Sequence, residues 1–197
     1  MDSPQGLRNS LRNRARIAQA AARLIAEHGI TDWGMAKRKA CRELGLGERE
    51  SLPGREEIEQ ALRDYNNLFR PVEQAASIRS LRTEALRWME RLAAWNPVLV
   101  GGVAAGWATE HSEPRLELEA EDAKNVEMAL LNDKLAYAPL PTRDRGTLLR
   151  VGTGDDTVLL VVLSPQERRN RRRSQDDDRL TAAELRALLP GSATDQG

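Results

Sequence analysis

The first residues that could carry out chemistry are two adjacent glycines after a short apolar run. Residues 98–100 read VLV, and Gly101 and Gly102 follow directly. A glycine pair after a strand lets backbone N–H groups approach a phosphate group, because no Cβ atom stands in the way. The pattern predicts a strand, a glycine turn and a phosphate-binding loop. A buried strand followed by a purely structural turn is the alternative.

Charged and apolar residues alternate in the segment that begins ten residues after the glycine pair. In EPRLELE, Glu113, Arg115, Glu117 and Glu119 are spaced two apart, so in a strand their side chains share one face. Pro114 cannot donate to a strand ladder, and regular alternation is therefore expected from Arg115 onward. Carboxylates on such a strand can hold Mg²⁺, which bridges and neutralises phosphate oxygens.

The order of these features resembles the nucleotidyltransferase superfamily with the DNA polymerase β-type palm. In that family an apolar residue and Gly-Gly or Gly-Ser precede, by about ten residues, the pattern Asp-apolar-Asp/Glu-apolar; here Val100-Gly101-Gly102 and Ser112-Glu113-Pro114-Arg115-Leu116 stand in these places. The segments AAARLIAEHGITDWGMAKRKA and AKNVEMALL also resemble uncharacterised proteobacterial nucleotidyltransferase-like proteins. The resemblance implies phosphoryl-transfer ancestry with Mg²⁺ and a nucleoside triphosphate.

The chain departs from this pattern at the metal ligands. Glu113 corresponds to the first carboxylate, but Arg115 stands where the second belongs, and Leu159 or a neighbour in TVLLVVL stands where the third is expected. A cation within about 4–6 Å of a metal site repels the ion and satisfies Glu113 instead. Glu117 or Glu119 could replace the missing ligand only if the strand register slipped by one pair. We therefore expect a catalytically weakened or inactive relative, a pseudoenzyme.

These considerations define a candidate site and leave three functions open. The candidate catalytic residues are Glu113 and Glu117, with Glu113 as the candidate metal ligand, and the candidate nucleotide- or phosphate-binding residues are Gly101, Gly102, Ser112 and Arg115. The favoured function is binding of a nucleotide, another phosphate-bearing ligand or RNA. An active Mg-dependent nucleotidyltransferase is the alternative, and a wholly structural loop is the third. Trp107 could stack on a base or be buried, and His111 could shuttle a proton or cap a turn.

Apolar periodicity predicts the elements that must position this site. Helices are expected at 8–28, from a cap at Thr31 or Asp32 to Leu44, at 55–69, at 72–95, after Asp122 and at 181–189, where Thr181 and Glu184 form a capping-box pattern. Strands are expected at 98–100, 116–120, 135–138, 148–151 and 158–163, and GTGDD between the last two indicates a hairpin. The fold class is therefore α+β, with an N-terminal helical region packed on a small mixed nucleotidyltransferase-like sheet. The predicted ranges are 1–70 for the helical region, 72–165 for the α+β domain and 166–197 for a charged linker and C-terminal helix.

Composition limits the environment and the partners. The chain has 197 residues, of which 40% are hydrophobic and 4% aromatic, and its formal net charge is +0, so no global charge attracts it to nucleic acid or membrane. The single cysteine, Cys41, rules out an intrachain disulfide and is expected in the core. No signal peptide and no apolar run of about 20 residues is present. We expect a cytoplasmic, bacterial protein with no membrane partner, and the sequence does not indicate an oligomeric state.

Two basic segments remain to be explained. Residues 17–46 resemble the first two helices of TetR-type repressors, which makes a DNA-binding regulator a further alternative. The helix that follows, REEIEQALRDY, begins with acidic residues that phosphates would repel, so DNA is not the expected partner. Lys37, Arg38 and Lys39 are expected to be solvated. The Arg-rich run 168–173, followed by QDDD, is expected to pair with its own acids or to serve as an arm for phosphate or RNA.

Overall fold

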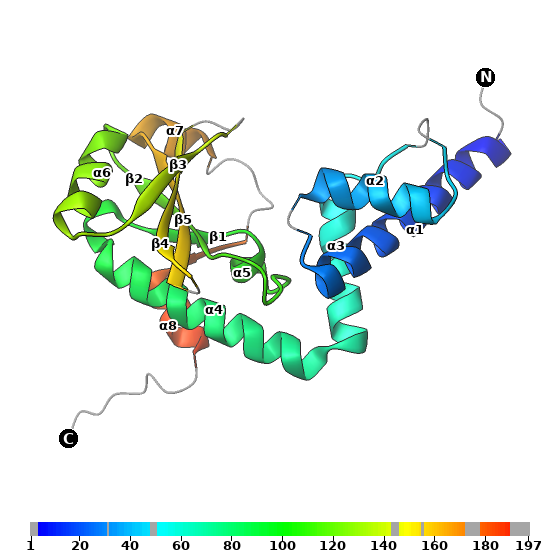
Figure 1. The fold of residues 1–197 in the computed structure, drawn as a ribbon, viewed down its shortest axis with the longest axis horizontal. Coiled ribbons are helices and arrows are strands. Elements are labelled where there is room, and N and C mark those ends of the chain that lie inside the picture. Colours follow the sequence, from blue (N-terminus) through cyan, green and yellow to red (C-terminus); the bar gives the residue numbers. More distant parts are fainter. Residues whose placement is uncertain are drawn as a thin grey trace. The chain divides into compact units, whose positions relative to one another are not determined.

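The computed structural model describes residues 4–30, 32–47, 51–142, 146–154, 156–171 and 178–189. It confirms the predicted α+β class, because N-terminal helices precede a six-stranded mixed sheet with further helices (Figure 1). The chain divides into two compact units. The helical unit comprises Met1–Ser77 and Thr109–His111, and the sheet unit comprises Ile78–Ala108 and Ser112–Gly197.

Three helices and the first turns of a fourth build the helical unit: α1 Pro4–His28, α2 Trp33–Glu43, α3 Arg55–Phe69 and α4 Pro71–Arg91. Asp32 caps α2, because its carboxylate accepts a hydrogen bond from the Met35 backbone N–H at 2.9 Å. The other predicted cap, Thr31, lies outside the described residues. The start of α3 is held by the Glu57 carboxylate, which accepts from the Gly54 N–H at 2.7 Å. Local capping therefore sets the helix boundaries in this unit.

Small and branched apolar side chains form the core of the helical unit. The buried residues include Ile17, Ala21 and Leu24 of α1, Ala36, Ala40 and Cys41 of α2, and Ile58 and Leu62 of α3. The alanines let the helix backbones approach closely, because they add little volume between them. Cys41 is buried, in agreement with its predicted place in the core.

The sheet unit contains strands β1 Val98–Val100, β2 Arg115–Glu119, β3 Tyr137–Leu140, β4 Thr147–Thr153, β5 Asp156–Leu163 and β6 Arg179–Thr181. Their order across the sheet is β3-β4-β5-β2-β1-β6. Only β2 and β5 are parallel, and the other neighbours are antiparallel. The predicted hairpin around GTGDD is confirmed by the antiparallel pairing of β4 with β5, although Asp155 lies outside the described residues.

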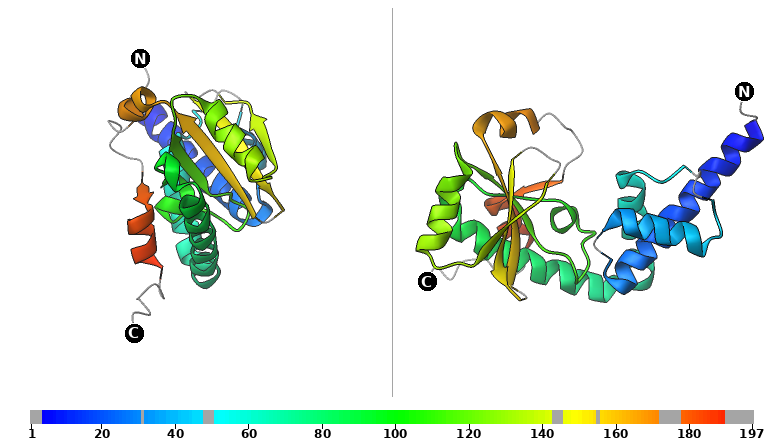
Figure 2. Two further views of the ribbon diagram at one scale, coloured as in Figure 1. Left: turned by 90° about the vertical axis from the view of Figure 1, so that its left-hand side faces the viewer. Right: turned by 45° about the horizontal axis from the view of Figure 1, so that its top comes forward.

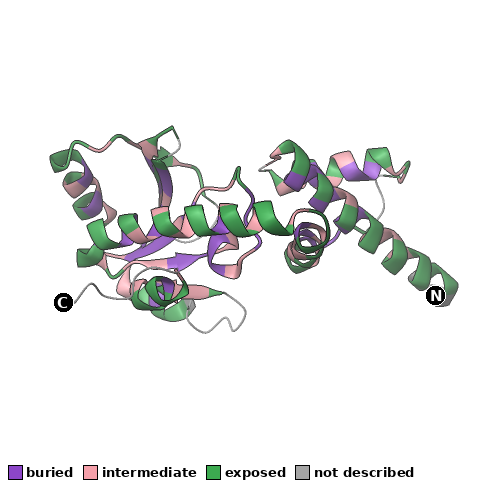
Figure 3. Ribbon diagram, turned by 90° about the horizontal axis from the view of Figure 1, so that it is seen from below, coloured by how far each residue is buried: buried purple, intermediate pink, exposed green. Residues whose placement is uncertain are grey.

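One face of this sheet is packed and the other carries the charges of β2. Leu116 and Leu118 point into a core that also receives residues of α4, α6 (Ala123–Asn132) and α8 (Ala182–Leu188). Figure 3 shows buried residues on the strands behind α4. The helix α8 lies beside α4, where Arg186 pairs with Glu90 (Figure 2). Because side chains alternate along a strand, Arg115, Glu117 and Glu119 point to the opposite face.

Three short elements differ from the sequence-based expectation. The turn helix α5, Gly102–Ala105, and the strand β6 were not predicted, and the single turn η1, Ala93–Trp95, follows α4 where a continuous helix was expected. The predicted polar linker begins with a helix, α7 Pro165–Arg171, whose start is capped by the Glu167 carboxylate accepting from the Ser164 N–H at 2.9 Å. Residues 172–177, with the rest of the Arg-rich run, lie outside the described residues.

Candidate functional site

A glycine turn follows β1, as the sequence predicts, and leads into the unpredicted helix α5. Each of its two glycines has a different physical reason. Gly101 has φ +75° and no neighbouring atom within 4 Å of the place of a Cβ, so backbone strain rather than crowding disfavours other residues here. At Gly102 a Cβ atom would lie 2.6 Å from Cζ3 of Trp107. Trp107 is buried. Gly102 therefore makes room for an indole ring, which gives this glycine a structural role.

An arginine from α4 holds the turn helix in place. The guanidinium of Arg82 donates from Nε to the Val103 carbonyl at 3.0 Å and from Nη2 to the Ala104 carbonyl at 2.8 Å. Burial lowers the pKa of Arg82 below its usual value. Because these two carbonyls belong to α5, Arg82 connects the glycine turn to the helix that crosses the packed face of the sheet.

A single cross-strand row places three arginines on the face that carries the charges of β2. Arg150 of β4 pairs with Leu159 of β5, Leu159 with Arg115 of β2, Arg115 with Val100 of β1, and Val100 with Arg179 of β6. Directly paired residues lie on the same face of a sheet, about 5 Å apart. We call Arg150, Arg115 and Arg179 the arginine row. It runs beside the glycine turn, because Val100 immediately precedes Gly101.

Each acidic residue of the candidate site is bound by an arginine from another element. Glu113 accepts a hydrogen bond from Nε of Arg150 at 2.8 Å. Glu117, which is 3% exposed, pairs with Arg179.

Glu119 completes this pattern at the far end of β2. It lies 3.4 Å from Nη1 of Arg168, an α7 residue whose side chain is 3% exposed. Nη2 of the same arginine donates to the Asn96 carbonyl at 2.7 Å. The charges of Glu113, Glu117 and Glu119 are therefore all neutralised by guanidinium groups, and Arg115 adds a further positive charge.

The two candidate catalytic carboxylates, Glu113 and Glu117, bind arginines on opposite sides of β2. Arg150 lies two strands from β2 on one side, and Arg179 lies two strands from β2 on the other side. Glu113 and Glu117 therefore extend in opposite directions along the arginine row. Leu159, expected where a third carboxylate belongs, pairs directly with Arg115. In the described ranges, no group of three or more His, Cys, Asp or Glu side chains could hold a metal ion.

The remaining predicted residues, Ser112 and His111, fall in different units. Ser112 is half-buried and directly precedes Glu113. His111 belongs to the helical unit, where its ring lies against Gly29, since a Cβ at Gly29 would be 2.8 Å from Cδ2 of His111. His111 is exposed, and of the two only Ser112 belongs to the sheet unit.

Sequence reasoning missed Arg150 and Arg179. It placed Arg168 in a run expected to pair with its own acids or to serve as an arm, whereas Arg168 binds Glu119 of β2 and the Asn96 carbonyl. Arg150 falls in a strand that was predicted, so the alternation of LLRV could have placed it on the solvent-facing side. Arg179 and Arg168 belong to β6 and α7, and neither element was predicted. Their pairing with Glu117 and Glu119 depends on strand register and helix placement, which adjacent residues do not encode.

None of the helices in the described ranges has the length and apolar character that crossing a membrane requires. Comparison of the chain with protein-family models, with curated proteins and with solved structures finds no match.

Proposed function

We propose that the sheet unit is a nucleotidyltransferase-like module that binds the phosphate groups of a nucleotide, or of a similar phosphate-bearing ligand, without metal-dependent turnover. The observation that carries the proposal is the arginine row beside the glycine turn. Four arginines and three glutamates meet on this face, so these seven side chains together carry one positive charge. A positive face attracts phosphate and disfavours a divalent cation.

The order of elements supports the nucleotidyltransferase-like part of the proposal. A long helix, α4, leads into β1, the glycine turn, α5, β2 and α6. This is the order on which the sequence resemblance rests. The observed pairing of Arg115 with Val100 also brings the guanidinium-bearing position next to the turn.

Arg115 is the residue we propose for the main phosphate contact. A guanidinium presents a planar set of donors that can bind two phosphate oxygens at once. Arg115 lies at the centre of the row, and the open space at Gly101 allows the backbone to be approached. Glu113 and Glu117 act as positioning residues, because they hold Arg150 and Arg179 on either side.

The donor set does not fit a magnesium ion. Magnesium requires several oxygen ligands in a compact octahedral arrangement. Here Glu113 and Glu117 point to opposite ends of the row, and each already accepts from a guanidinium. Freeing Glu117 would leave a buried charge on each partner, at a cost of about 3–5 kcal/mol.

Thermal unfolding with a panel of nucleoside triphosphates, with and without Mg²⁺, tests the proposal. At a ligand concentration ten times the dissociation constant, we expect the melting temperature to rise by about 3–6 °C whether or not Mg²⁺ is present. Arg115→Gln should abolish the shift. The matched control is Arg87→Gln, which removes an exposed arginine of α4 in the same unit.

Two results would overturn the proposal. A shift that appears only with Mg²⁺ would favour the alternative, an active nucleotidyltransferase. The second result is a rise in melting temperature that persists in Arg115→Gln, or that is lost equally in Arg87→Gln. Either would show that phosphate binding does not depend on the arginine row.

A further inference from the structure

A second basic surface lies on the first helix of the helical unit. Arg8, Arg12 and Arg16 of α1 are exposed and spaced four residues apart. In an α-helix four residues advance by about 6 Å and about 40°, so the three side chains share an arc of about 80° over about 12 Å. We call them the α1 stripe. Ile17 and Ala21 lie buried on the opposite face of the helix, so the stripe faces away from the core.

The α1 stripe has no acidic partner in the part of the chain that the structure describes. Two other arginines of α1 do have one, because Arg14 binds Glu57 at 2.8 Å and Arg23 lies 3.4 Å from Glu43. Among the described residues, the stripe therefore differs from Arg14 and Arg23 in having no ion-pair partner.

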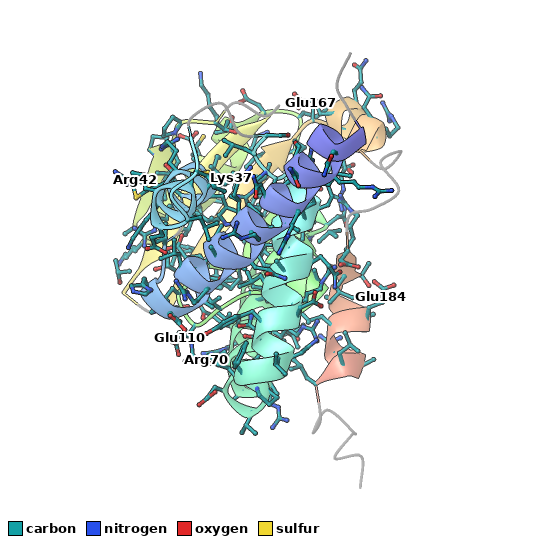
Figure 4. The ribbon with its side chains drawn as sticks, turned by 90° about the vertical axis from the view of Figure 1, so that its right-hand side faces the viewer. Lys37, Arg42, Arg70, Glu110, Glu167 and Glu184 are labelled. Carbon is teal, nitrogen blue, oxygen red and sulfur yellow. The ribbon has the colours of Figure 1, made fainter. Side chains whose placement is uncertain are left out.

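Helix α2 adds further positive charge to the same unit. Arg38 and Arg42 are exposed and also spaced by four residues; Figure 4 labels Lys37 and Arg42 on this helix. Residues 4–47 contain nine Lys or Arg and only three Asp or Glu.

All three of these acids are already engaged. Glu27 accepts from the Tyr65 hydroxyl, Asp32 caps α2, and Glu43 pairs with Arg23. No carboxylate of α1 or α2 in the described ranges is thus left to neutralise the α1 stripe.

We propose that the α1 stripe, with Arg38 and Arg42 of α2, binds the sugar–phosphate backbone of RNA. Unneutralised arginines that repeat along a rigid helix suit a polyanion, because each phosphate contact releases a counterion. The exposed amides of Asn9 and Gln19 lie along the stripe. Amide groups can donate to and accept from the ribose 2′-hydroxyl, which DNA lacks. This inference concerns the helical unit and does not rest on the function proposed for the sheet unit.

Two other polyanionic partners fit the surface less well. A membrane-bound helix inserts an apolar face into lipid, but most apolar residues of α1, from Ile17 to Ala26, are buried in the core of the helical unit, and Leu11 is the large apolar side chain described as exposed there. A DNA-reading helix would have to enter the major groove, and α3 starts with Glu56 and Glu57 in its first turn. Phosphates repel such a start.

Fluorescence anisotropy with a labelled RNA duplex of about 16 base pairs tests the inference, with salt varied between about 50 and 200 mM. The test variant of the full chain is Arg8→Ala/Arg16→Ala. The matched control is Arg79→Ala/Arg87→Ala, which removes two exposed arginines with the same eight-residue spacing from α4. Both variants change the net charge equally, and circular dichroism checks that both remain helical.

We expect the wild type and the control to bind RNA alike. The test variant should bind about tenfold more weakly, and the slope of log affinity against log salt should become shallower by about two. If both variants bound RNA equally weakly, the loss of affinity would follow from net charge alone, and the inference would be overturned. So would the absence of RNA binding by the wild type at the lowest salt.

Two further binding measurements distinguish RNA from DNA and from a lipid surface. Equal affinity for a DNA duplex of the same sequence would overturn the assignment to RNA. Binding to anionic vesicles that depends on Arg8 and Arg16, without binding to RNA, would overturn it in favour of a lipid surface.

Discussion

Arginine behaves differently in the two units of this chain. In the sheet unit, Arg168 and Arg179 are largely removed from solvent and hold Glu119 and Glu117. In the helical unit, Arg8, Arg12 and Arg16 lie in solvent, with no acidic partner among the described residues. A buried charge costs several kcal/mol unless it is paired, whereas an exposed one can stay alone. The same residue type therefore secures strand pairing in one unit and creates an electrostatic field in the other.

The largest change in stability is expected from removing one partner of the buried pair of Glu117 and Arg179. Arg179→Met removes the cation that pairs with the buried carboxylate of Glu117, and we expect the free energy of unfolding in urea to fall by about 3 kcal/mol. The double variant Glu117→Leu/Arg179→Met should recover most of this loss, because replacing a whole buried pair by apolar side chains is close to neutral.

The control for this variant is an exposed pair in the same unit. Arg186→Met breaks the pair with Glu90 at the surface, where we expect a loss of about 1 kcal/mol or less. A loss for Arg179→Met no larger than this control would mean that the buried pair does not hold the sheet.

The same glycine substitution should have opposite effects in the two units. Gly102→Ala places a Cβ 2.6 Å from the Trp107 ring, and we expect it to lower the free energy of unfolding by about 2 kcal/mol. Gly6→Ala in α1 meets no atom within 4 Å and should raise it by about 0.5–1 kcal/mol, because alanine favours the helix. Urea unfolding measures both, and a stabilising Gly102→Ala would contradict the packing role of this glycine.

A smaller effect is expected from a helix cap in the helical unit. Asp32→Ala removes the acceptor of the Met35 N–H, which should cost about 1 kcal/mol in urea unfolding. Asp32→Ser keeps an acceptor at the N-cap and should preserve most of the stability. Equal losses in the two variants would show that the carboxylate acts in some way other than capping.

The smallest expected effect is the pH dependence contributed by an exposed pair. The Arg14 guanidinium, together with the Gly54 N–H, holds the pKa of Glu57 below its usual value. A carboxyl group whose pKa is lowered by folding stabilises the protein above its unfolded pKa, and this contribution is lost as the pH falls through the folded value.

Glu57→Gln should therefore flatten the acid limb of the stability curve, measured as urea midpoints against pH. The change should be small, because solvent screens the pair. The adjacent exposed residue provides the control as Glu56→Gln. An unchanged acid limb in Glu57→Gln would mean that this pair contributes nothing to stability.

The sequence predicts the local features of this molecule better than its long-range pairs. The cap at Asp32, the capping box of Thr181 with Glu184, and the hairpin of β4 and β5 follow from residues a few positions apart, and all three are confirmed. Strand β6 has only three residues and forms by pairing with β1. No local pattern of residues 179–181 indicates that partner.

The candidate site likewise has local features that the sequence predicts and long-range contacts that it does not. The glycine turn after β1 agrees with the sequence-based expectation, whereas the pairing of Leu159 with Arg115 was not predicted. The reason for Gly102 depends on where Trp107 folds back, and the partners of Glu113 and Glu117 depend on register across five strands. Alternation along a predicted strand assigns each residue to a face of the sheet. The cation that binds each acid is determined only when all the strands have paired.

The position of β6 in the chain has a consequence for biosynthesis. Every other strand of the sheet lies before residue 164, so the ribosome has made them before Arg179 and its neighbours appear. Until β6 is made, the edge of β1 that pairs with it is open and Arg179 is missing from its pair with Glu117. Strand β6, translated after the five other strands, therefore completes the sheet.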